Sequence, residues 1–207
     1  MTKSQSLCRF ISEQTDFLQR KDSFAQKTYN HMGATIVDSV LQAGLNYYTI
    51  VFPRVEHLLL TYPYYRTTSD FLILIDSMPL RDIIHFDNTA KSWSIFCLAW
   101  FLNNHGIQTE KEAAVWLKSE SNTQCLLGIK GIGNKTIDYL KGLVGIRESI
   151  AIDRHLFRLL KLAGIEYNDY KEAHDIYSQA ASLLDCDPYC LDKSVWNYMT
   201  KRVPEYV

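Results

Sequence analysis

Hydrophobic residues recur along most of this chain at the spacing of an amphipathic helix, and the strict alternation that is typical of strands is scarce. Ile36, Val37, Val40 and Leu41, for example, fall on one face of a helix that is expected to begin near Thr35. Residues that favour helix starts recur between such stretches: Pro53, Thr68, Pro79, Asn88, Thr109, Asp153, Asn168 and Pro188. The pattern predicts an all-α protein of about ten short helices joined by short loops.

The most apolar stretch of the chain begins after Asn88-Thr89 and contains WSIFCLAWFL. It is apolar on nearly every face, which predicts a helix buried at the centre of its part of the fold. Cys125, further along, is expected to be a small buried hydrophobic residue. Residues 1–30 are polar and only weakly periodic, so we expect a short helix and an extended arm there.

Charge and composition exclude few classes of function. The chain has 207 residues, of which 47% are hydrophobic and 22% charged, as in an ordinary globular protein. Its formal net charge of −1 provides no overall basic bias for nucleic-acid binding. Positive charge is local, however: residues 128–161 contain seven Lys or Arg and three acidic residues. Any affinity for nucleic acid is therefore expected to concentrate in that stretch.

The five cysteines form neither a disulfide framework nor a complete metal site. Cys186 and Cys190 make a C-x3-C pair, but no second pair completes a zinc set, so free thiols in a reducing compartment are expected. The polar N-terminus lacks the apolar core of a signal peptide. The longest apolar run, residues 71–75, is too short to span a bilayer. We therefore expect a protein that is not secreted and has no membrane partner.

Residues 129–133, Ile-Lys-Gly-Ile-Gly, lie between two helical patterns. A G-x-G turn between antiparallel helices can aim the first backbone N–H groups of the second helix at a phosphate oxygen, and the positive end of the helix dipole adds to the attraction. An ordinary helix–helix turn with glycine caps has the same local sequence, so this short motif alone leaves both interpretations open.

The longer context resembles the helix-hairpin-helix DNA glycosylase superfamily, in particular its endonuclease III-like members. The family hairpin, Leu-Pro-Gly-hydrophobic-Gly followed by a variable residue and Lys-Thr, is similar to residues 129–136 here. The family segment Val-Asp-x-His-hydrophobic-x-Arg is similar to residues 152–158, and 18 residues separate Lys135 from Asp153, as in that family. Two positions depart from the family pattern: Lys130 replaces a proline, and Ile137 replaces a small residue.

The resemblance implies a catalytic pair. Lys135 would attack the sugar C1′ as a free amine and form a Schiff base, and Asp153 would assist cleavage of the N-glycosidic bond. β-Elimination would then cut the strand, which makes the enzyme a bifunctional DNA glycosylase and AP lyase. Two alternatives remain open: a monofunctional glycosylase in which Asp153 activates water, and a non-catalytic helix-hairpin-helix DNA-binding module. Asp153 also precedes an apolar helical pattern and is a good N-cap in its own right.

The resemblance further implies a DNA-backbone site at the hairpin, comprising Lys130, Gly131, Ile132, Gly133, Asn134 and Thr136. Since chemistry at C1′ requires a flipped nucleotide, a side chain from the early helix end should fill the gap in the duplex. The candidates for this filler and for the base pocket are Gln42, Asn46, Tyr47 and His155. The sequence leaves open which damaged or mismatched base is excised.

The same resemblance implies two helical lobes with the active site in the cleft between them. One lobe would be contiguous, residues 31–148, and would end in the hairpin at about 122–145; the other would combine 1–30 with 149–207. Many relatives carry an iron–sulfur cluster on four cysteines, but only Cys186 and Cys190 lie near this C-terminus, so we expect no cluster and no metal. The expected partner is double-stranded DNA with a damaged base or an abasic site, bound by a cytoplasmic or nuclear monomer.

Overall fold

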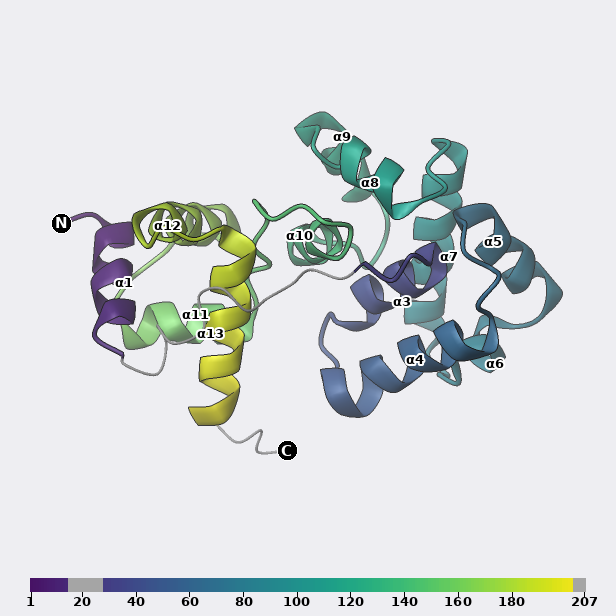
Figure 1. The fold of residues 1–207 in the computed structure, drawn as a ribbon, viewed down its shortest axis with the longest axis horizontal. Coiled ribbons are helices and arrows are strands. Elements are labelled where there is room, and N and C mark those ends of the chain that lie inside the picture. Colours follow the sequence, from purple (N-terminus) through teal and green to yellow (C-terminus); the bar gives the residue numbers. More distant parts are fainter. Residues whose placement is uncertain (15–27, 203–207) are drawn as a thin grey trace. The chain divides into compact units, whose positions relative to one another are not determined.

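The computed structural model of this chain describes residues 1–14 and 28–202. All regular elements in these ranges are helices, which confirms the all-α prediction. The chain divides into two compact units (Figure 1). We call Gln26–Ile146 the central unit, and we call Met1–Ala25 together with Arg147–Val207 the terminal unit.

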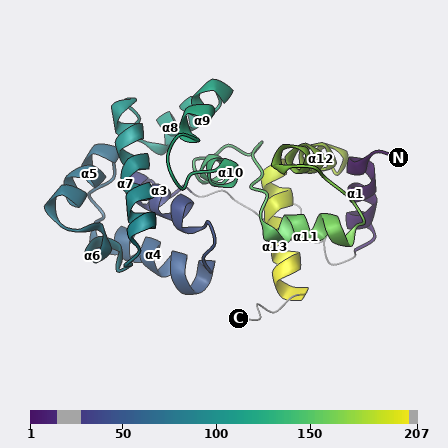
Figure 2. The ribbon, with the colours of Figure 1, turned by 180° about the vertical axis from the view of Figure 1, so that it is seen from behind.

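The central unit is organised around one buried helix, α3 (Met32–Leu41), all ten residues of which are buried. Four other helices of the unit, α4, α5, α7 and α10, pack against α3, and Figures 1 and 2 show α7 and α10 beside it. The elements that follow α3 are the π-helical turn η1 (Tyr47–Val51), α4 (Phe52–Thr61), α5 (Thr68–Ser77), α6 (Leu80–Ile84), α7 (Thr89–Asn104), α8 (Glu110–Trp116), α9 (Glu120–Leu126) and α10 (Asn134–Leu143).

The start of α3 is fixed by a buried carboxylate from α8. Glu110 accepts hydrogen bonds from the backbone N–H of Asn30 at 2.8 Å and from the hydroxyl of Thr35 at 2.5 Å. The Nδ1 atom of His31 caps the helix by accepting from the N–H of Ala34 at 3.1 Å, and burial lowers the pKa of this histidine. Because His31 is the cap, the helix begins at Met32 and not near Thr35.

Most helix starts follow the sequence signals. Asn88 and Thr109 cap α7 and α8, as expected, through bonds from side-chain oxygen to backbone N–H. Two starts differ by one residue. Thr67 caps α5, and Asp70 completes a reciprocal capping box with it. Asp169 caps α12 (Tyr170–Leu183), because the neighbouring Asn168 instead donates to Glu172.

The terminal unit has its own hydrophobic core. Its helices are α1 (Lys3–Ser12), α11 (Arg154–Leu162), α12 and α13 (Pro188–Arg202), and α1 packs against α12, beside which both ribbon views show it. Leu7 from α1 and Leu156 from α11 are fully buried in this core. Tyr177 of α12 is also fully buried, and its hydroxyl donates to the backbone oxygen of Leu156 at 2.7 Å. That bond ties α12 to the first turn of α11.

Helix α7 does not have the burial that its sequence predicts. Ile95, Leu98 and Leu102 face the core, but Trp93 and Trp100 are each 56% exposed, so the prediction of a helix buried all round was wrong. An apolar residue on every face does not specify which face lies at the surface. The prediction for Cys125 was also wrong, since this residue is exposed. No helix in the described ranges, α7 included, is long and apolar enough to cross a membrane.

The hydrogen bonds of Glu110 lead to a testable prediction about the stability of the folded protein. We expect Glu110→Ala to lower the free energy of unfolding by about 2–4 kcal/mol, because buried donors lose their acceptor. Glu112 lies on the same helix but is exposed, and Glu112→Ala removes an acceptor for the backbone N–H groups of Gln108 and Thr109, which lie near the surface. Urea denaturation of both variants should therefore show a clearly smaller loss for Glu112→Ala; equal losses would contradict the role given to Glu110.

Candidate functional site

The turn between α9 and α10 is shaped by one glycine. Gly131 has a φ of +88°, a conformation that side chains with a Cβ rarely adopt. A Cβ at this position would also overlap the hydroxyl of Ser94. That hydroxyl lies 2.8 Å from the backbone oxygen of Lys130, to which it donates a hydrogen bond, so α7 packs directly against the turn. The path of the chain at Gly131 is therefore set by α7 and by the absence of a side chain.

The first turn of α10 presents backbone donors that its N-cap residue does not satisfy. Gly133 occupies the N-cap position with an extended backbone and makes no side-chain capping bond. A Cβ at Gly133 would have no atom within 4 Å, and both Gly133 and Asn134 are exposed. Since the first N–H groups of a helix lack intrahelical acceptors, this end of α10 can receive an anion. Thr136, in contrast, is buried, as is Ile132 within the turn.

Lys135, the second residue of α10, is turned toward the carboxyl end of α3. Its Nζ donates to the backbone oxygen of Gln42 at 2.9 Å and lies 5.6 Å from the centroid of the Tyr139 ring. The side chain is half-buried. An amine at this place is held by a main-chain oxygen on one side and by the face of an aromatic ring on the other.

A second lysine binds the same end of α3. The Nζ of Lys91, in the first turn of α7, donates to the backbone oxygens of Val40 at 2.7 Å and Ala43 at 2.8 Å. Burial lowers the pKa of Lys91, and the positive charge of Lys135 lowers it further. Two ammonium groups thus lie close enough at one helix end to repel each other, and this repulsion acts on both.

The Tyr139 ring is anchored to α3 by a buried acid. Asp38 is fully buried and accepts hydrogen bonds from the hydroxyl of Tyr29 at 2.7 Å and from that of Tyr139 at 3.3 Å. Burial raises the pKa of Tyr29, and the charge of Asp38 raises it further. Tyr29 therefore stays protonated as a donor, and the hydrogen bond from Tyr139 to the same carboxylate holds its ring near the amine of Lys135.

The three pocket candidates in the central unit have different surroundings. The side-chain Oε1 of Gln42 is buried and has no hydrogen-bond partner among the described residues. Asn46 caps the π-helical turn η1, its Oδ1 accepting from the N–H of Thr49 at 3.0 Å. Tyr47 is half-buried, with its ring edge-on to that of Tyr48 at 5.3 Å. Gln42 is joined to Lys135 through its main-chain oxygen.

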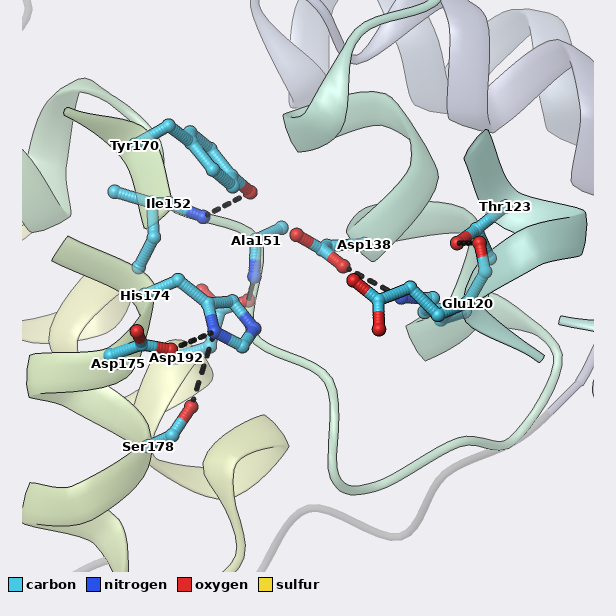
Figure 3. A network of polar contacts seen from close by, with 11 residues as sticks. Glu120, Thr123, Asp138, Ala151, Ile152, Tyr170, His174, Asp175, Ser178 and Asp192 are labelled. Atoms are coloured by element: carbon cyan, nitrogen blue, oxygen red, sulfur yellow. Dashed lines mark hydrogen bonds and ion pairs between the residues drawn. The ribbon is translucent and has the colours of Figure 1, made fainter. Parts of the chain in front are cut away.

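Asp153 belongs to the terminal unit and caps α11. Its Oδ1 accepts from the backbone N–H of His155 at 2.8 Å and of Leu156 at 3.1 Å. The extended segment before it is held by two side chains, which Figure 3 shows: Asp192 accepts from the N–H of Ala151, and the hydroxyl of Tyr170 accepts from that of Ile152. Both capping bonds end on Oδ1, so the cap does not require the second oxygen of Asp153.

His155 is 5% exposed, and its ring packs against other side chains of the terminal unit. Arg154 donates through Nε to its Nε2 at 3.4 Å, and the Trp196 ring lies edge-on at 6.4 Å. His155 is therefore a packed side chain inside the terminal unit. Asp153 and His155 are therefore positioned by the terminal unit, and Lys135 and Gln42 by the central unit.

The cysteines are free thiols, as expected. Cys190 is buried beside Arg147 and Asp187; burial raises the pKa of its thiol to about 11, and hydrogen bonding to Asp187 contributes to the shift. Among the described residues, no group of three or more His, Cys, Asp and Glu side chains is arranged to hold a metal ion.

Sequence reasoning missed three residues around Lys135: Lys91, Asp38 and Tyr139. Only the position of Tyr139, four residues after Lys135 on the same helix, carried a usable signal. No protein-family model matches this chain, and no curated protein matches it either. The resemblance of residues 129–136 and 152–158 to the helix-hairpin-helix glycosylases therefore depends only on the residues of those two segments.

The two glycines of the turn should respond differently to alanine. Gly131→Ala is expected to lower the free energy of unfolding by about 1–3 kcal/mol, because the new methyl group meets Ser94 in a backbone conformation that alanine disfavours. Gly133→Ala, the matched control, places its methyl in open space and should cost about 1 kcal/mol or less. Chemical denaturation of the two variants compares them directly, and a larger loss for Gly133→Ala would refute this account of the turn.

Proposed function

We propose that this protein is a DNA base-excision glycosylase with AP-lyase activity, in which α9, the turn and α10 form a helix-hairpin-helix. The observation that carries the proposal is the location of Lys135. It is the second residue of a helix whose first N–H groups face outward from a glycine N-cap, and it precedes Asp153 by 18 residues. A nucleophilic amine beside an anion-binding helix end is the arrangement that chemistry on a DNA sugar requires.

In this proposal the hairpin holds the DNA backbone. Gly133 and Asn134 are exposed at the start of α10, where the helix dipole and free N–H groups attract a phosphate. Lys130 is exposed on the turn and adds a cation at the position where the family has a proline. Such contacts fix the register of the protein on duplex DNA without reading its sequence. They suit an enzyme that must examine many bases in search of a damaged one.

The chemistry begins with the Lys135 side chain as a free amine. Its nitrogen attacks the sugar C1′, the bond from C1′ to the base breaks, and the base leaves with the bonding electron pair and takes up a proton. The Asp153 carboxylate stabilises the positive charge that develops on the sugar and accepts a proton from the attacking amine. Opening of the sugar ring gives a Schiff base between Nζ and C1′.

Strand cleavage follows from the Schiff base. Loss of a proton from C2′ allows the electrons to move toward the iminium, and the bond from C3′ to its phosphate oxygen breaks. The strand on the 3′ side leaves with a 5′-phosphate end, and water then hydrolyses the Schiff base and releases the lysine. The partner is thus double-stranded DNA with a damaged base or an abasic site, and the products are a free base and a nicked strand.

Covalent trapping tests the role of Lys135. Borohydride reduces the Schiff base to a stable amine, so incubation with a duplex containing an abasic site should yield a protein–DNA adduct on a denaturing gel. Lys135→Ala should reduce the adduct by at least about 100-fold, since the nucleophile is lost. The matched control Lys118→Ala removes an exposed lysine and should trap as the parent protein does.

The trapping result also distinguishes the alternatives. Base release from a panel of oxidised, deaminated and mismatched bases without any adduct would point to a monofunctional glycosylase that uses water. DNA binding without either reaction would leave only a binding module. Either outcome would overturn the lyase proposal.

Asp153→Asn separates the chemistry of Asp153 from its capping role. Asparagine caps helices about as well as aspartate, so the free energy of unfolding should change by less than about 1 kcal/mol. Base release should fall by about 100-fold or more, because an amide neither accepts the proton nor offsets the charge on the sugar. Unfolding and single-turnover base release should be measured on the same preparation. If base release is retained, the carboxylate has no role in catalysis.

A further inference from the structure

The carboxyl end of α3 is occupied by two lysines from two other helices. Lys91 of α7 donates to the carbonyl oxygens of Val40 and Ala43, and Lys135 of α10 donates to that of Gln42 between them. The last carbonyls of a helix lack intrahelical donors, and their partial negative charge attracts cations. Because the acceptors are main-chain oxygens within four residues of the chain, 40–43, the two amines are held near each other.

The surroundings of the pair strengthen the repulsion. Lys91 is half-buried, and its acceptors lie at the end of a helix that is buried throughout. Water screens charges poorly in such places, so two neighbouring ammonium groups are costly when both are protonated. Loss of one proton relieves the repulsion, and the amine that loses it becomes a nucleophile.

We propose that Lys91 is a positioning residue for Lys135: it secures the end of α3 that holds the Lys135 amine, and its charge favours the neutral form of that amine. This inference rests on the proposed function, because it matters only if Lys135 reacts as a nucleophile. This role requires that Lys91 carries its charge when Lys135 reacts, and Lys91 itself does not attack the sugar.

Other charged and titratable groups of the central unit face this region. The Asp38 carboxylate on α3 favours a protonated lysine and so acts against Lys91, and it accepts hydrogen bonds from the hydroxyls of Tyr29 and Tyr139. Asp138 on α10 is paired with Lys141 at 3.1 Å. Tyr47 of η1 interacts with Tyr29. Lys91 is therefore the cation that opposes protonation of Lys135 from the neighbouring helix α7.

The pH dependence of strand cleavage tests the inference. Single-turnover cleavage of an abasic duplex should be measured on the full chain from pH 5.5 to 9.5. Lys91→Gln keeps a hydrogen-bond donor but removes the charge, so the acid limb of the profile should move up by about one pH unit. Cleavage on that limb should fall about tenfold, with the rate at high pH retained. Lys91→Arg keeps the charge and should retain the parent profile.

Controls separate this role from others. Lys111→Gln removes an exposed lysine on α8 and should leave the profile in place. An unshifted profile in folded Lys91→Gln, or a shifted one in Lys91→Arg, overturns the inference. A uniform rate loss that follows weaker binding of a tetrahydrofuran duplex would make Lys91 a DNA contact and also overturn it. If the parent protein cleaves no abasic duplex, the proposed function itself fails; if Lys135→Ala still cleaves and Lys91→Gln does not, Lys91 is the nucleophile.

Discussion

The need of the main-chain carbonyls at the carboxyl end of α3 for hydrogen-bond donors is the constraint on which the central unit depends. A helix buried along its whole length ends in main-chain oxygens that need donors, and the residues that follow it, Gln42 and Ala43, are only partly exposed. Lys91 and Lys135 supply those donors from α7 and α10. Helix α3 is thereby joined to both neighbours through charged hydrogen bonds, which are stronger than neutral ones. The same requirement brings two cations together.

This arrangement gives a buried helix end two roles. It completes the hydrogen bonding of the fold, and it places a lysine where deprotonation relieves repulsion. The turn before α10 also positions Lys135. Gly131 and Ser94 determine where α10 begins and therefore where Lys135 lies. Asp38 contributes by holding the Tyr139 ring near the amine. The proposed nucleophile is thus supported by three helices, which limits its freedom before substrate binds.

Local features of the fold could be predicted from sequence, and long-range ones could not. The caps at Asn88, Thr109 and Asp153 depend on atoms within three residues, so their sequence signals were sufficient. The burial of α7 depends on which helices cover it, and a helix that is apolar all round carries no such information. Nothing in the local sequence marks Lys91, because its acceptors lie 51 and 48 residues away in the chain. Glu110 was missed for the same reason, since the backbone that it fixes lies 80 residues earlier.

The central claim is that Lys135 is the residue that joins covalently to DNA. The most direct measurement is mass spectrometric mapping of the borohydride-reduced adduct with an abasic duplex, after digestion of both protein and DNA. The account predicts a sugar remnant on Nζ of Lys135 and an unmodified peptide containing Lys91. A remnant on Lys91 or on any other amine, or the absence of an adduct under conditions in which the protein binds the duplex, would contradict it.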